Sequence, residues 1–108
     1  MSYDSTLKRY DDLVEKCSGF DRKGKTMPYT SSNGHMFSLL NKDGELGLRF
    51  SKETQKAYFE KFNTSFLMSH GAKMNGYIEI TGTMLNDTTL MLELFQESLE
   101  FVNSLPPK

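Results

Sequence analysis

The stretch of this sequence best suited to chemistry is residues 66–77, FLMSHGAKMNGY, in which His70 precedes Lys73 by three positions. An imidazole and an ammonium group this close together can bind an anion or take part in proton transfer. The glycines of the stretch are equally typical of a turn between two strands. We expect a hairpin loop with a solvent-exposed histidine. The alternative function is a small-molecule-binding site or small enzyme centred on His70, Lys73 and Tyr77.

Two specific motifs are absent from this stretch. A phosphate-binding loop needs the longer GxxxxGK(S/T) pattern between a strand and a helix, and no helix is expected after Lys73. Ser69 and His70 do not suit a nucleophile and its base, because adjacent residues of a strand point in opposite directions. No acidic residue is indicated that would orient the histidine. The stretch therefore predicts no catalytic residue.

Metal coordination and thiol chemistry are also not expected. Cys17, His35 and His70 are the only soft or imidazole ligands, and no two of them stand at CxxC or HxxxH spacing. A zinc site needs three or four protein ligands. Cys17 falls in the apolar stripe of a predicted helix, where a buried small hydrophobe is far more common than a reactive thiolate. The sequence therefore predicts neither a metal nor another cofactor.

A second possible binding surface is the face of the predicted sheet that carries Glu45, Arg49, Tyr77 and Glu79. These residues alternate with apolar ones along two strands, so they should point away from the core. The simplest interpretation is a solvated face with cross-strand charge pairs. Because arginine and tyrosine are enriched at binding hot spots, Arg49 and Tyr77 are the expected anchors for a protein or ligand.

The elements that carry these residues are predicted from hydrophobic periodicity and capping signals. Asp4 or Ser5 can cap a first helix, Ser51 a second, and Asn86 or Asp87 a third. The predicted helices are residues 5–18, 52–62 and 88–104, and the predicted strands are residues 25–31, 35–41, 45–50, 65–69 and 74–81.

Turn dipeptides and short connections indicate how the strands are arranged. Asn33-Gly34 and Asp43-Gly44 are strong hairpin signals, and Pro28 restricts the first strand to an edge. Such short connections make a sheet mostly antiparallel. A five-stranded sheet with one apolar face needs helices over that face. The predicted fold is a two-layer α+β domain, α-β(3)-α-β(2)-α, that spans residues 1–108.

Length and charge limit the function classes. A chain of 108 residues is expected to form one domain, and its formal net charge of -1 without a basic run does not favour nucleic-acid binding. A nucleic-acid accessory role is a further alternative, which requires Lys23, Lys25, Arg49 and Lys73 on one face. The single cysteine cannot form an intramolecular disulfide, which fits a reducing compartment. The polar amino terminus and the lack of a long apolar run predict a soluble, cytoplasmic protein without membrane association.

The last predicted helix has an unusually wide apolar sector of about 200°, whereas one contact with a sheet needs little more than 100°. The first helix can cover part of this excess. A second copy of the chain can cover the rest, since two-fold dimers are the commonest oligomers. The sequence therefore predicts a homodimer, with Met91, Phe95 and Val102 as candidate contacts.

Three segments, GHMFSLL, KMNGYIEI and ESLEFVNSLPPK, resemble the TfoX amino-terminal domain family in their order and spacing. The first residues, SYDSTLKRYDDLV, are similar to the first helix of that family, whose members are small bacterial proteins. The resemblance covers nearly the whole chain. It implies an α-β(3)-α-β(2)-α fold, the same order that periodicity predicts.

Two departures restrict what the resemblance implies. The family commonly has Met-Phe-Gly-Gly after the first loop, whereas Met27 is followed here by Pro28, Tyr29 and Thr30, so the first strand should be shorter or differently bent. In the competence regulators of the family a second domain follows, and this chain ends at Lys108. The family offers no established active site. The resulting interpretation is a non-enzymatic, TfoX-like domain that works by protein association, as a homodimer or with an unknown protein partner.

Overall fold

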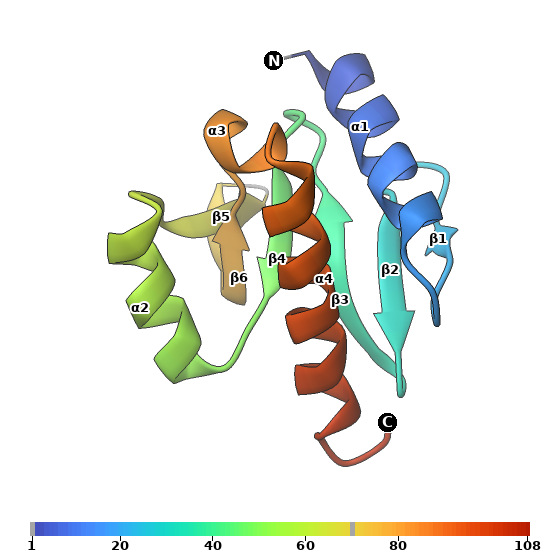
Figure 1. Cartoon of the computed structure of the whole chain (residues 1–108), viewed down its shortest axis with the longest axis vertical. Helices are drawn as coiled ribbons and strands as arrows, with labels where there is room; N and C mark the ends of the chain where they lie inside the picture. The colour runs from blue at the N-terminus through green and yellow to red at the C-terminus, as the bar shows by residue number, and fades with distance from the viewer. Residues whose placement is uncertain (1, 70) are drawn as a thin grey trace.

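The computed structural model describes residues 2–69 and 71–108, and its helices and strands are shown in Figure 1. In chain order the elements are α1 (Tyr3–Lys16), β1 (Arg22–Lys23), β2 (Tyr29–Ser32), β3 (His35–Leu40), β4 (Leu46–Arg49), α2 (Lys52–Lys61), β5 (Phe66–Ser69), β6 (Ala72–Glu79), α3 (Gly82–Leu85) and α4 (Thr88–Asn103). The predicted α+β class is confirmed. The sheet has six strands rather than five, and the short helix α3 is a further addition.

All neighbouring strands of the sheet are antiparallel, in the order β1-β2-β3-β4-β6-β5. Asn33 and Gly34 both have positive φ, 57° and 79°, as the predicted tight turn between β2 and β3 requires. The predicted first strand, residues 25–31, is wrong in its bounds. Its place is taken by β2, which begins after Pro28, and by the two-residue strand β1.

The caps show where local sequence determines the helices. Ser51 caps α2 as predicted, because its Oγ accepts a hydrogen bond from the Thr54 N–H at 3.2 Å. Asp87, one of the two predicted residues, caps α4. The predicted start of α1 is wrong: Ser2 is its cap, and Ser2 Oγ accepts from the Ser5 N–H at 3.2 Å.

The helices lie over one face of the sheet, and α4 lies near the middle of that layer (Figure 1). Their apolar side chains meet those of β3, β4 and β6 in one core cluster, of which the largest fully buried members are Tyr10, Phe37, Phe50 and Phe95. The wide apolar sector of α4 is therefore used within the chain, because α4 contacts the sheet, α1 and α3. No described helix is long and apolar enough to cross a bilayer.

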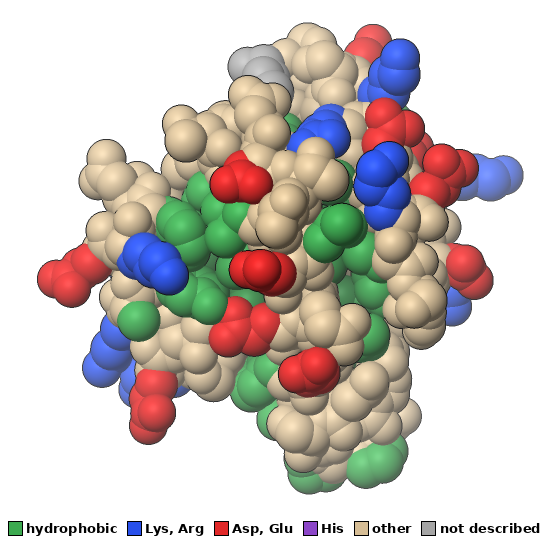
Figure 2. Space-filling model, in the orientation of Figure 1, with side chains coloured by type: hydrophobic (Ala, Val, Ile, Leu, Met, Phe, Trp, Pro, Cys, Tyr) green, Lys and Arg blue, Asp and Glu red, His purple; other side chains and the backbone are tan. Residues whose placement is uncertain are grey.

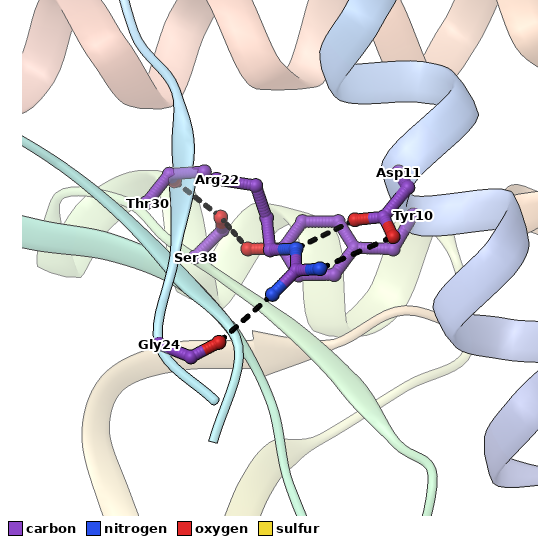
Figure 3. Close-up of polar contacts among 6 residues, drawn as sticks. All are labelled: Tyr10, Asp11, Arg22, Gly24, Thr30 and Ser38. Atoms are coloured by element: carbon purple, nitrogen blue, oxygen red, sulfur yellow. Dashed lines mark hydrogen bonds and ion pairs between the residues drawn. The ribbon is translucent and has the colours of Figure 1, made fainter. Parts of the chain in front are cut away.

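Hydroxyl and charged groups tie α1 to the sheet (Figure 3). Tyr10 and Ser38 share a buried hydrogen bond of 2.6 Å, and Ser38 also bonds the hydroxyl of Thr30 on the neighbouring strand. Arg22 Nε donates to Asp11 Oδ1 at 2.6 Å and Nη2 donates to Oδ2 at 3.3 Å. This two-point contact holds β1 beside α1, which explains a strand that no sequence pattern predicts.

The face of the sheet opposite the helices carries a second, smaller apolar cluster of Leu39, Leu67 and Tyr77. Leu67 belongs to the edge strand β5, yet its side chain lies over Gly47 of β4, beyond the intervening strand β6. The β5–β6 hairpin therefore curls across this face. The prediction that Tyr77 lies on a solvated face is wrong, because the curl leaves Tyr77 only 6% exposed.

Candidate anion-binding pocket

An open pocket of about 530 Å³ lies where β4 ends and α2 begins. Its walls come from these two elements, from β5, from the middle of β6 and from the last turns of α4. The lining residues are Arg49, Phe50, Lys52, Gln55, Phe66, Asn75, Gly76 and Phe101. They provide one guanidinium, one ammonium group, two amides and three phenyl rings, and no carboxylate. This combination is suited to an anion that also has an apolar part.

Arg49 is the last residue of β4, and its side chain is held in place by two neighbours. Its Cζ lies 5.7 Å from the centroid of the Phe101 ring, a cation–π distance. Its aliphatic chain passes Gly76, where Cγ lies 3.5 Å from the position that a Cβ would occupy. Gly76 has a φ of 97°, which favours glycine, and its carbonyl accepts a hydrogen bond from the Phe50 N–H at 3.0 Å. The guanidinium is therefore pre-positioned at the pocket.

Lys52 is the first residue of α2, directly after the cap. One turn later, the buried side chain of Gln55 donates from Nε2 to Phe50 O at 2.9 Å, which locks the first turn of the helix to the end of β4. The amino-terminal end of a helix carries partial positive charge and so adds to the charge of Lys52. This wall of the pocket therefore carries the positive charge of the Lys52 side chain and the partial positive charge of the backbone at the start of α2.

Lys73 lies beside the pocket rather than in its lining. Its Nζ is 5.2 Å from the centroid of Phe66, and that ring also packs against Phe59 of α2 at 4.9 Å. Within the described residues, none of Arg49, Lys52 and Lys73 forms a salt bridge. The described part of the chain therefore provides no ion-pair partner for the positive charges near this pocket.

The four predicted site residues have separate outcomes. Arg49 lies in the pocket and Lys73 beside it, whereas His70 lies outside the described residues. Tyr77 is the direct cross-strand partner of Arg49, but its hydroxyl donates to Met36 O at 2.8 Å and it does not line the pocket. Burial raises the pKa of Tyr77 to about 12, and the Arg49 charge opposes this rise. Tyr77 therefore supports the sheet instead of anchoring a ligand.

No sequence pattern predicted the pocket residues Lys52, Gln55, Phe66 and Phe101. A signal for Lys52 was available, because RFSK places two basic residues around a helix cap at the end of a strand. Phe101 gave no such signal. Its spacing places it in the apolar sector of the last helix, and only the packing of α4 brings its ring next to Arg49.

The predicted dimer contacts do not face solvent. Met91, Phe95 and Val102 are each 0% exposed within the single chain. Their side chains cannot touch a partner unless α4 leaves the core, so these contact predictions are wrong. The cause is the central position of α4. The sheet, α1 and α3 together cover more of the surface of this helix than a contact with the sheet alone would.

The basic residues of the nucleic-acid alternative are not gathered on one face. Lys23 lies on β1 and Lys73 on β6, and four inter-strand spacings of about 4.8 Å each separate these strands. Lys25 follows β1, on the side of the sheet away from the Arg49 pocket. Lys23 and Lys25 therefore lie in one region, and Arg49 and Lys73 lie in another. Nucleic-acid binding usually needs a continuous basic patch.

The candidate metal ligands are also separated. Among the described residues, no three His, Cys, Asp or Glu side chains are arranged to hold a metal ion. His35 is buried, and its Nε2 donates to Pro106 O at 2.8 Å, which fastens the carboxy-terminal segment to the β2–β3 hairpin. Cys17 is half-buried rather than fully buried as predicted, and desolvation raises the pKa of its thiol.

No protein-family model and no curated protein sequence matches this chain.

Proposed function

We propose that this chain is a non-catalytic binding domain that recognises a small organic anion in the pocket of Arg49 and Lys52. The supporting observation is that two cations, which form no salt bridge within the described residues, line one pocket together with phenyl rings, and that no carboxylate is among its lining residues. An anion placed there would form charge-assisted hydrogen bonds, the stronger class of such bonds in proteins. The sequence also allowed a small-molecule site, centred on His70, Lys73 and Tyr77. The proposed site is instead centred on Arg49 and Lys52.

The lining also indicates the shape of the ligand. Phe66 and Phe101 offer apolar walls, and the volume lies within the usual range of roughly 300–1,000 Å³ for small-molecule sites. Because the Arg49 guanidinium already rests on the Phe101 ring, little side-chain freedom is lost when an anion binds. A carboxylate or phosphate ester with a flat apolar body fits this arrangement best.

A titration followed by two-dimensional amide NMR tests this function, with phenyl phosphate and benzoate as probes. Saturable chemical-shift changes confined to residues 49–55, residues 75–76 and Phe101 are the expected result. The proposal would be wrong if the chemical-shift changes spread over all exposed lysines, or if they did not saturate at millimolar probe concentrations. Inorganic phosphate serves as the control, since it offers the charge without the apolar body.

Protein association is the second candidate function, and partly exposed apolar residues of α4 favour it. The part-exposed set on α4 is Leu90, Leu92 and Phe101, and the part-exposed Leu105 follows the helix. Figure 2 shows acidic side chains along the position of α4, with hydrophobic side chains on both sides of them. A homodimer formed along α4 would bring Glu93, Glu97 and Glu100 of both copies together. Such self-association should therefore depend on salt, which screens repulsion between exposed charges.

We further propose membership of the TfoX amino-terminal domain family, on the segments GHMFSLL, KMNGYIEI and ESLEFVNSLPPK. A bacterial source and a cytoplasmic location go with this proposal, and the single cysteine is consistent with such a compartment. A regulatory role would follow if the anion is a cellular signal. Identifying the proteins and small molecules that co-purify with the native chain tests the regulatory role.

A further inference from the structure

We infer that Lys73 supplies a third cation to an anion in the Arg49 pocket and so makes this pocket selective for phosphate monoesters over carboxylates. The inference rests on the proposed anion-binding function, and it adds the class of anion and the residue that selects it. Arg49 ends β4, Lys52 begins α2, and Lys73 lies near the start of β6. The three positive charges therefore come from three different elements around one pocket.

The Phe66 ring connects Lys73 to the pocket. Phe66 is one of the lining residues, and the Lys73 Nζ lies 5.2 Å from the centroid of its ring. The ring of Phe59 on α2 packs against the Phe66 ring at a centroid distance of 4.9 Å, which limits where the Phe66 ring can lie. Asn75, two residues after Lys73, also lines the pocket. The Lys73 ammonium group therefore lies next to a wall of the pocket.

A register shift between β5 and β6 allows Lys73 to reach this ring. If the pairing continued regularly from Phe66, Met68 would lie opposite Gly76, but Met68 pairs with Lys73 instead. Gly76 has a φ of 97°, which lies outside the range of a regular strand. The alternation of side chains along β6 is therefore interrupted between Tyr77 and Lys73. As a result Lys73 does not share the orientation of Tyr77, and its Nζ lies over the Phe66 ring.

The Lys73 side chain is free to move toward an anion. It is exposed, and within the described residues it forms no salt bridge that would have to break. Its cation–π contact with Phe66 is the weaker interaction, because a charge-assisted hydrogen bond to a phosphate oxygen is stronger than an exposed cation–π contact. The four-carbon stem of a lysine is flexible and carries three rotatable donors. An anion in the pocket would therefore draw the ammonium group from the ring to itself.

Three cations favour a phosphate monoester over a carboxylate. At neutral pH a phosphate monoester carries a charge of about −1.5 to −2 and three strong acceptor oxygens. A carboxylate has a single charge and two oxygens in one plane. Electrostatic attraction grows in proportion to the charge of the ligand. The tetrahedral oxygens of the phosphate can also accept hydrogen bonds from different sides. Lys73 therefore adds more to the binding of a phosphate monoester than to the binding of a carboxylate.

Calorimetric titration of the full chain at slightly alkaline pH tests this inference with phenyl phosphate, phenyl sulfate and benzoate. Phenyl sulfate has the shape of phenyl phosphate with a single charge, and benzoate has a single charge on a planar group. We expect phenyl phosphate to bind about tenfold more tightly than either of the others. Equal affinity for phenyl phosphate and phenyl sulfate would overturn the inference and leave the anion pocket itself in place. If none of the three binds, the proposed function is wrong and the inference fails with it.

Lysine variants separate the role of Lys73 from that of general positive charge. Lys73→Gln should weaken phenyl phosphate binding about tenfold and phenyl sulfate binding much less, so that the preference disappears. Lys73→Arg keeps the charge and should keep the preference.

Lys61→Gln is the matched control for these variants. The Lys61 Nζ lies 5.5 Å from the centroid of the Phe62 ring, in a similar cation–π contact, and Lys61 does not line the pocket. Lys61→Gln should therefore leave all three affinities unchanged, and the melting temperatures of both glutamine variants should match that of the wild type because both lysines are exposed. An equal loss of affinity in Lys61→Gln, or a preference that survives Lys73→Gln, would show that Lys73 does not select the anion.

Discussion

The side chain of Leu67 lies against Gly47, with its Cγ 3.1 Å from the position that a Cβ on Gly47 would occupy. A strand on the edge of the sheet thus covers a strand two places away. The contact depends on the missing side chain at residue 47. On the same face of the sheet, Leu67 packs with Tyr77 in the small apolar cluster.

Gly47→Ala should destabilise the fold, because the added methyl group enters space already filled by Leu67. Overpacking of this kind typically costs about 1–3 kcal/mol. Urea unfolding measures the loss in the free energy of unfolding. In a double-mutant cycle with Leu67→Ala, the cost of Gly47→Ala should largely disappear. An undiminished cost in the Leu67→Ala background would show that the two residues do not contact.

Arg49→Gln and Lys52→Gln should each weaken phenyl phosphate binding by about tenfold, since each removes a charge-assisted hydrogen bond. Lys56→Gln is the matched control, because Lys56 is exposed on the same helix and does not line the pocket. Calorimetric titration measures all three. An equal loss of affinity in Lys56→Gln would mean that the anion is attracted by the overall charge of α2 and does not bind in the pocket.

The burial of Tyr77 should make stability fall at alkaline pH. Burial raises the pKa of Tyr77 from 10.0 to about 12, so the unfolded chain loses this proton first. The contribution is fully present below pH 10 and is lost as the pH rises through about 12. Between these limits the wild type should lose more stability than Tyr77→Phe, by on the order of 2 kcal/mol. Urea unfolding at stepped pH checks this, and identical pH profiles for the two proteins would contradict it.

Self-association along α4 should appear as the salt concentration rises, because repulsion between the acidic rows is then screened. Light scattering at tens of micromolar should show the 12.4 kDa chain mass at low salt and twice this mass at high salt. Leu92→Ser should abolish the change, as it removes part-exposed apolar surface. A 12.4 kDa mass at both salt concentrations would end the homodimer proposal.

Much of the fold could be predicted from neighbouring residues alone. Asn33-Gly34 predicts a hairpin because few other residues tolerate positive φ at both positions, and Ser51 predicts a helix start because its hydroxyl reaches the N–H three residues on. Periodicity predicted most strands and the α+β class. These signals succeed because backbone sterics and local hydrogen bonds act over a few residues.

The candidate pocket and the covered sheet face depend on contacts between distant residues. Alternation along β6 shows on which side of the strand Tyr77 lies. That side is shielded from water because Leu67 packs against it. The width of the apolar sector on α4 showed that much surface must be buried. Only the tertiary packing decides that Met91 is buried within its own chain and that the Phe101 ring lies next to the Arg49 guanidinium. Hydrophobic burial is not directional, so a sequence shows which residues need cover while the tertiary structure decides what covers them.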